Sequence, residues 1–141
     1  MILYVDTSAL VPLLIDEPWS GRCGELWDSA DIVTSARLAY VEAVAALAQG
    51  ARLGRISAGG AGQVREVLDD LWSAVNVIEI GSELMMSAAD LALTHGFRGY
   101  DATHCAAALS VNDDQLVAAT GDRRLLAAWR AEGLATWNAN A

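Results

Sequence analysis

Short β-favouring runs alternate with longer helical patterns along the 141 residues of this chain. Five apolar or β-branched runs occur at positions 2–5, 32–34, 75–80, 115–120 and 135–137. Between them, apolar residues recur with helical spacing at 9–15, 21–29, 36–51, 61–74, 82–95, 102–111 and 123–132. Strands that alternate with helices usually form a mostly parallel sheet with helices on both faces. The sequence therefore predicts a single α/β domain, residues 1–141, built on a mostly parallel five-stranded sheet.

The composition is that of a folded protein, with 54% hydrophobic and 19% charged residues. The first apolar run has no basic residue ahead of it, and no apolar stretch is as long as a bilayer span, so we expect a cytoplasmic protein. The two cysteines, Cys23 and Cys105, lack the spacing of a metal or redox motif. We expect both to be reduced and mostly buried.

The formal net charge of −9 argues against tight metal-free binding of nucleic acid, because phosphate contacts usually supply most non-specific affinity. All nine basic residues are arginines, and the candidates for phosphate contacts are Arg52, Arg55, Arg98, Arg123 and Arg124. The five tryptophans, which include Trp19, Trp72 and Trp129, are not interleaved with basic residues. We expect them to be core or interface anchors rather than stacking platforms for bases.

Two aspartates stand where predicted strands end. Asp6 follows the run 2–5, and Asp122 follows the run 115–120 and a glycine that permits a tight turn. Acids at the carboxyl ends of parallel strands face the crevice in which open α/β sheets bind ligands. Each aspartate also precedes a predicted helix, where aspartate is a favoured N-cap. The position of each residue alone leaves both roles open.

Glu42 lies within the predicted helix 36–51. The residues three and four positions away are all apolar, namely Leu38, Ala39, Ala45 and Ala46. This spacing predicts a carboxylate inside the core-facing stripe of the helix. Because a buried unpaired carboxylate is costly, we expect an ion or a catalytic neighbour there. The alternative is a buried ion pair with an arginine such as Arg37.

Asp101 precedes the predicted helix 102–111, where its simplest role is that of an N-cap. Capping is compatible with metal binding, because one carboxylate oxygen can bond the helix while the other binds an ion. His104 follows three residues later and shares the helical face of Asp101. It is a candidate to relay a proton or to orient a carboxylate, although a histidine among alanines more often serves packing.

Taken in order, these motifs resemble the PIN-domain nucleases, and among them the VapC-type toxins of bacterial toxin–antitoxin pairs. The resemblance covers nearly the whole chain and rests on Tyr4-Val5-Asp6-Thr7-Ser8-Ala9-Leu10, a helical Glu42, Tyr100-Asp101-Ala102-Thr103-His104 and Thr120-Gly121-Asp122. It implies the strand order 3-2-1-4-5, in which the ends of the first and fourth strands are adjacent. It also implies a homodimer and a cognate antitoxin, with charge complementarity favouring an antitoxin arginine in the acidic pocket.

The family's acidic centre maps by this resemblance onto Asp6, Glu42, Asp101 and Asp122. Thr120 supplies its accessory hydroxyl, and Ser8 is a further contributor. Some relatives carry another acid shortly after the last aspartate. This chain has Arg123, Arg124, Leu125 and Leu126 there, which argues against a fully occupied second metal site.

The implied reaction is hydrolysis of RNA, leaving 5′-phosphate and 3′-hydroxyl ends. Two carboxylates about 4 Å apart repel by roughly 4 kcal/mol at an effective dielectric near 20, so four clustered acids need a cation. A set of oxygen ligands favours Mg²⁺ or Mn²⁺ over zinc. We expect Asp6 and Asp101 to be primary ligands, with Glu42 and Asp122 completing the coordination or positioning the attacking water.

Other functions fit the sequence less well. In a haloacid-dehalogenase-like phosphatase an acid follows the nucleophilic aspartate by two positions and a lysine assists it; here that position is Ser8. A phospho-accepting receiver domain also needs a lysine, and this chain has none. Two further alternatives keep the PIN fold: a protein that binds RNA and blocks translation without cutting it, and a nuclease of RNA processing that is not a toxin.

Overall fold

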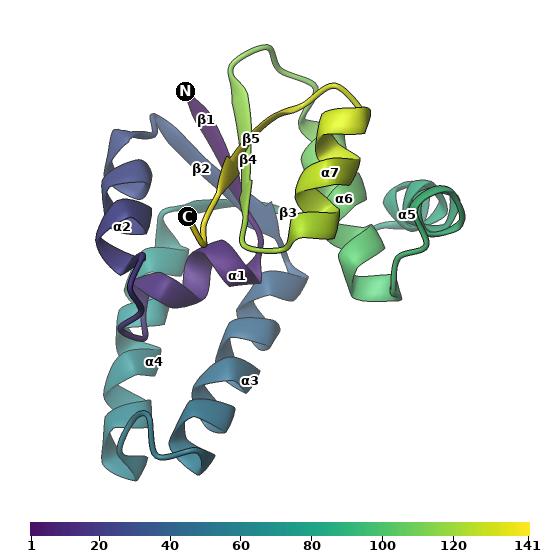
Figure 1. Cartoon of the computed structure of the whole chain (residues 1–141). Helices are drawn as coiled ribbons and strands as arrows, with labels where there is room; N and C mark the ends of the chain where they lie inside the picture. Colours follow the sequence, from purple (N-terminus) through teal and green to yellow (C-terminus); the bar gives the residue numbers. More distant parts are fainter.

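The structure is a computed structural model that describes residues 1–141 except for the side chain of Ala58. Its centre is a sheet of five parallel strands in the order β3-β2-β1-β4-β5 (Figure 1). The strands are β1 (Ile2–Val5), β2 (Ile32–Ala36), β3 (Val75–Ile78), β4 (Leu116–Thr120) and β5 (Ala135–Asn138). The predicted fold class and the strand order implied by the family resemblance are both confirmed.

Helical segments connect the strands. They are α1 (Thr7–Leu10), the 3₁₀ helix η1 (Val11–Leu13), α2 (Ser20–Ser29), α3 (Leu38–Arg52), α4 (Ala58–Ser73), α5 (Ser82–His95), α6 (Gly99–Val111) and α7 (Arg123–Ala131). The predicted order of elements is correct. The segment predicted as one helix at 9–15 is divided after Leu10, where η1 begins, and Pro12 lies in the first turn of η1, where a missing N–H costs little.

Helices cover both faces of the sheet. The side chains of β1 alternate between the two faces: Tyr4 packs with residues of α6 and α7, whereas Leu3 and Val5 pack with residues of α1 and α2. The indole of Trp129 in α7 is fully buried and meets the Tyr4 ring edge-on at 5.7 Å between centroids. Because helices cover both faces of β1, the strand is held in place, and it fixes the position of the residues that follow it.

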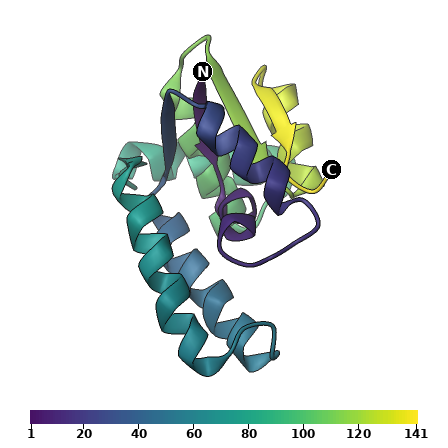
Figure 2. The same cartoon turned by 90° about the vertical axis from the view of Figure 1, so that its left-hand side faces the viewer.

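The helices α3 and α4 pack against each other and extend away from the sheet (Figures 1 and 2). A small core of Leu10, Ala43 and Leu68 joins this pair to α1. The contact places the first turns of α3 beside the residues that follow β1.

Both cysteines are unpaired and buried, as expected. Burial raises the pKa of the Cys23 thiol, and burial together with the negative charge of Glu132 raises the pKa of Cys105 to about 12. Neither thiol is therefore a reactive thiolate at neutral pH. Among the residues described, no helix has both the length and the apolar character to cross a membrane.

Candidate active site

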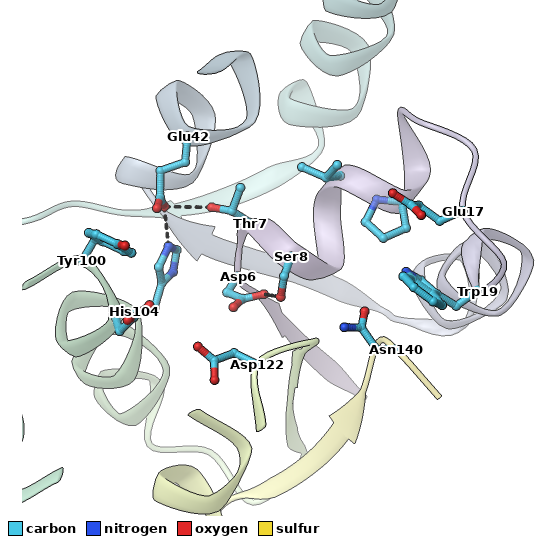
Figure 3. A pocket seen from close by; sticks show the side chains of 13 residues that line it. Asp6, Thr7, Ser8, Glu17, Trp19, Glu42, Tyr100, His104, Asp122 and Asn140 are labelled. Atoms are coloured by element: carbon cyan, nitrogen blue, oxygen red, sulfur yellow. Dashed lines mark hydrogen bonds and ion pairs between the residues drawn. The ribbon is translucent and has the colours of Figure 1, made fainter. Parts of the chain in front are cut away.

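A pocket of about 380 Å³ lies at the carboxyl ends of β1 and β4, between α1, α3 and α6 (Figure 3). This volume falls within the range of small-ligand sites, roughly 300–1,000 Å³. Its lining consists of Asp6, Thr7, Ser8, Val11, Pro12, Glu17, Trp19, Glu42, Tyr100, Asp101, His104, Asp122 and Asn140. All four acids predicted from the sequence are among these residues, although they come from separate parts of the chain.

Asp6 is the most buried of the four acids, with 6% of its surface exposed. One carboxylate oxygen, Oδ1, accepts hydrogen bonds from the Ser8 hydroxyl at 2.7 Å and the Ala9 backbone N–H at 3.1 Å. The other oxygen, Oδ2, accepts the Thr120 hydroxyl at 2.5 Å. Asp6 therefore caps α1, and it also faces the pocket. Burial raises its pKa, although the charge of His104 and these hydrogen bonds oppose the rise.

The turn after β4 is tied to the residues after β1. The Ser8 hydroxyl accepts a hydrogen bond from the Gly121 N–H at 2.7 Å, and the Thr120 hydroxyl accepts one from the Asp122 N–H at 3.0 Å. A Cβ on Gly121 would come within 2.5 Å of the Asn140 amide, so a larger residue here would displace that exposed side chain. The Thr120 hydroxyl thus contacts both Asp6 and the turn that follows β4.

Asp122 caps α7, as its position before the helix suggested. The backbone N–H groups of Arg124 and Leu125 both donate to Oδ1, at 2.8 and 3.3 Å. No hydrogen bond to Oδ2 is present among the described residues. Capping therefore uses one oxygen and leaves the second for the pocket, which Asp122 lines.

Glu42 lies beside the buried stripe of α3 rather than within it, which corrects the prediction from the sequence. The buried positions are Ala39, Ala43, Leu47 and Gly50. The carboxylate points from the edge of this stripe toward the pocket (Figure 3). The predicted stripe was too wide because small alanines occur on both the buried and the exposed sides of this helix.

Glu42 does not pair with Arg37, which pairs with Glu79 instead; its partner is His104, the residue named from the sequence as a candidate to orient a carboxylate. Oε1 of Glu42 accepts hydrogen bonds from the Thr7 hydroxyl at 2.8 Å and from Nε2 of His104 at 2.6 Å. Burial of Glu42 disfavours its charged form. The hydrogen bond and charge of His104, together with the Thr7 hydroxyl, outweigh burial and lower the pKa of Glu42.

Asp101 is not an N-cap, contrary to the simplest interpretation of its position. The helix begins at Gly99 with Arg98 as the cap residue, so Asp101 lies in the first turn. There its negative charge interacts favourably with the positive end of the helix dipole. Its Oδ2 lies 3.4 Å from Nε of Arg98, whose guanidinium also lies over the Tyr100 ring at 4.7 Å.

These acids share a pocket but not a tight cluster. Among the residues described, no three His, Cys, Asp or Glu side chains lie close enough together to hold a metal ion. Like charges repel, which favours separated carboxylates while no cation is present. The donor chemistry fits Mg²⁺ or Mn²⁺, because carboxylate oxygens line the pocket without a thiolate. Binding would draw the other carboxylates toward Glu42, whose Oε1 is already held by Thr7 and His104.

Several pocket residues were not identified from the sequence. Trp19 packs against the core as expected, but it also lines the pocket, as do Glu17, Tyr100 and Asn140. Thr7 is a partner of Glu42. The amide of Asn140 donates to the Gly121 carbonyl at 3.1 Å, which brings the end of the chain to the pocket. Thr7 and Tyr100 could have been identified because each is next to a predicted acid in the sequence. No sequence feature pointed to Asn140.

Residues 3–129 match the model of the PIN domain family. The chain is 40% identical over 124 residues to the ribonucleases VapC45 and VapC49 of two Mycobacterium tuberculosis strains, covering 88% of this chain and 86% of each relative. It therefore belongs to the PIN-domain family. Its similarity to these two proteins places it with the VapC-type members.

Solved structures share the fold. PAE2754 of Pyrobaculum aerophilum is 27% identical with a TM-score of 0.70, over 96% of this chain and 83% of that chain. VapC20 of Mycobacterium tuberculosis, a toxin that cleaves the sarcin–ricin loop, is 21% identical with a TM-score of 0.68. The match covers 89% of this chain and 94% of that chain. A chain of a toxin–antitoxin complex from Klebsiella pneumoniae is 17% identical with a TM-score of 0.63. The match covers 85% of this chain and 86% of that chain.

Proposed function

We propose that this chain is a Mg²⁺- or Mn²⁺-dependent endoribonuclease and the toxin of a toxin–antitoxin pair. The observation that carries the proposal is that Asp6, Glu42, Asp101 and Asp122, from four separate segments, line one pocket. Similarity to two proteins named ribonucleases over 86% of their length supports the choice of RNA as substrate. An RNA substrate in turn supports a cytoplasmic location. We take the domain to span residues 1–141, because β5 completes the sheet beyond the matched residues 3–129.

Each acid has a defined task in this proposal. Asp6 and Asp101 are the primary ligands, and Thr120 and Ser8 hold Asp6 in place. Bound Mg²⁺ or Mn²⁺ would neutralise the acids and stabilise the charge that develops on the phosphodiester. Glu42 and Asp122 complete the ligand set. Either one could orient the attacking water, because capping of α7 uses only Oδ1 of Asp122 and the donors to Glu42 use only Oε1.

The walls of the pocket suggest how single-stranded RNA is held. Tyr100 is 42% exposed beside Asp101, and Trp19 lines the pocket on the side of α1. Aromatic rings offer stacking surfaces to any base. Arg98, which lies over the Tyr100 ring, is the predicted arginine best placed for a phosphate near the acids.

Cleavage itself is tested by incubating the purified chain with total RNA and with a structured RNA, with Mn²⁺ or with excess chelator. We expect shortened fragments only with Mn²⁺, because without a cation the acidic pocket repels phosphate. The new 5′ ends should be substrates for a ligase that requires a 5′-phosphate. RNA that is retarded on a native gel but keeps its length would support the alternative in which the protein binds without cutting.

The partner of the toxin would be a cognate antitoxin with a basic segment. The net charge of −9 and the acidic pocket favour such a segment, and an arginine is suited to pair with carboxylates. The shared fold with a toxin–antitoxin complex is consistent with this partner. We also propose a homodimer, for which the exposed side chains of Met85, Met86 and Leu93 on α5 offer an apolar surface.

Co-expression of this chain with the product of the adjacent gene tests both assembly proposals. We expect a stable complex that does not cut RNA, and light scattering should give two copies of this chain in it. Expression of the chain alone should arrest growth. A chain that assembles with no such product and does not slow growth would favour the alternative of an RNA-processing nuclease.

A further inference from the structure

A chain of polar groups runs through the core behind Glu42. The hydroxyl of Tyr4 in β1 lies 2.7 Å from Nδ1 of His104 in α6, and Nε2 of the same ring lies 2.6 Å from Oε1 of Glu42 in α3. Tyr4 is fully buried and His104 is 3% exposed. Figure 3 shows His104 directed from α6 toward the carboxylate. Three elements far apart in the sequence are thus linked by side chains alone.

The direction of these hydrogen bonds follows from the chemistry of the groups. An ionised carboxylate only accepts hydrogen bonds, so Nε2 of His104 carries a proton and donates it to Glu42. In the neutral ring Nδ1 then accepts the hydroxyl proton of Tyr4, whereas in the charged ring, whose charge lowers the pKa of Glu42, Nδ1 donates to the Tyr4 oxygen. Hydrogen bonds at both nitrogens fix the orientation of the histidine ring. Both ring nitrogens are therefore engaged within the protein.

The contacts on Glu42 are uneven. Thr7 and His104 both donate to Oε1, and no hydrogen bond to Oε2 is present among the described residues. A glutamate on an exposed helix face would sample many rotamers, whereas these two donors hold one oxygen and leave the other available to the pocket. Preorganising a ligand in this way strengthens binding because less freedom is lost when the ion arrives.

A purely structural role would explain the burial of Tyr4, whose ring packs edge-on against Trp129. It does not explain why one nitrogen of the His104 ring bonds to the buried Tyr4 and the other to Glu42, an acid of the pocket. A role for His104 as catalytic base is also disfavoured, because neither nitrogen is free to reach a substrate. The remaining role is to hold Glu42.

We propose that Tyr4 and His104 are positioning residues that hold Glu42 in the orientation in which it binds the metal ion. This inference rests on the proposed nuclease function. It assigns the histidine to the orientation of a ligand rather than to proton transfer.

The test is the affinity for Mn²⁺, measured by calorimetry on the purified chain without RNA. His104→Leu removes the donor while keeping similar bulk, so we expect the Kd for Mn²⁺ to rise by roughly 10–100-fold, as for other residues that hydrogen-bond to a metal ligand. His104→Gln keeps an N–H donor at a similar reach and should restore the Kd to within a few-fold of wild type. Tyr4→Phe should raise it in the same direction but less.

The other histidine provides a matched control. His95 pairs with Glu132 away from the pocket, so His95→Gln should bind Mn²⁺ like wild type. Circular dichroism and melting curves confirm that each variant is folded. An unchanged Kd in folded His104→Leu, or an equal rise for the leucine and glutamine variants, would overturn the proposal.

The positioning role and the nuclease function can fail separately. If the Kd series is as expected but wild type cuts no RNA, the positioning role stands and the nuclease function fails. If wild type cuts RNA in Mn²⁺ while folded His104→Leu binds Mn²⁺ with unchanged affinity, the nuclease function stands and the positioning role fails.

Discussion

Replacing Asp6 with asparagine should reduce metal-dependent RNA cleavage by roughly 10²-fold or more. Charge stabilisation by a bound metal is worth several kcal/mol, and each 1.36 kcal/mol corresponds to a factor of ten in rate. Asp6 is buried at the end of β1 and is tied to the Ser8 and Thr120 hydroxyls, so a neighbouring acid cannot readily take its place. The measurement is the initial rate of fragment formation with saturating Mn²⁺.

The matched control is Asp70→Asn, which makes the same chemical change on the exposed surface of α4, outside the pocket. It should cut RNA at the wild-type rate. If Asp6→Asn retained near-normal metal-dependent cleavage, Asp6 would not be a ligand and the proposed site would be wrong.

Loss of activity in Asp6→Asn should not come from loss of the fold. Burial raises the pKa of Asp6, so the folded state favours the protonated carboxyl. Protonation of Asp6 stabilises the fold fully at a pH below the pKa that an aspartate has in the unfolded chain, about 3.9. This stabilisation is lost as the pH rises through the higher pKa that Asp6 has in the folded protein. At neutral pH without metal, ionised Asp6 therefore lowers stability. The Asp6→Asn variant lacks this charge, so without metal the variant should melt at the same temperature as wild type or at a higher one.

Saturating Mn²⁺ should raise the melting temperature of the wild-type chain by about 5–10 °C relative to chelator. An ion at 100 times its Kd that binds only the folded state stabilises it by about 2.7 kcal/mol, and 1 kcal/mol corresponds to roughly 2–4 °C for a chain slightly larger than this one. The effect arises because the cation relieves repulsion among acids that the fold brings to one pocket. Thermal melts with Mn²⁺, with Mg²⁺ and with chelator at equal ionic strength measure it.

Non-specific binding of cations to this acidic chain is the main competing explanation. Asp70→Asn should keep the full shift, whereas Asp6→Asn should lose most of it. Equal shifts in the two variants would mean that the ion acts on the surface charge rather than at the pocket. No shift in wild type would show that the acids do not gather around a cation at millimolar concentrations.

The sequence predicted those features that depend on local pattern. Asp6 and Asp122 were placed correctly because an acid one or two residues after a buried strand lies at the carboxyl edge of the sheet. Strand runs were recognisable because they are short, apolar and separated by helices. The order of the strands came from the family resemblance, since alternation of elements does not determine which strands are neighbours.

Features that depend on three-dimensional neighbours were predicted less well. The start of α6 was placed too late because Gly99 is a poor helix former by propensity, yet it begins the helix and puts Asp101 in its first turn. Glu42 was placed within the buried stripe because alanines do not distinguish a buried side from an exposed one. Its link to His104, 62 positions away, depends on how α3 and α6 meet, which no local pattern encodes.

The parallel pairing of β1 with β4 has a consequence for the synthesis of the protein. The hydroxyl that holds Asp6 belongs to Thr120, which is translated 114 residues later, and the capping acid Asp122 comes later still. A nascent chain that ends before β4 has Asp6 but neither the strand beside it nor the turn that fixes its carboxylate. The proposed pocket therefore cannot assemble until β4 and Asp122 have been translated. A chain whose synthesis stops before β4 should have no cutting activity.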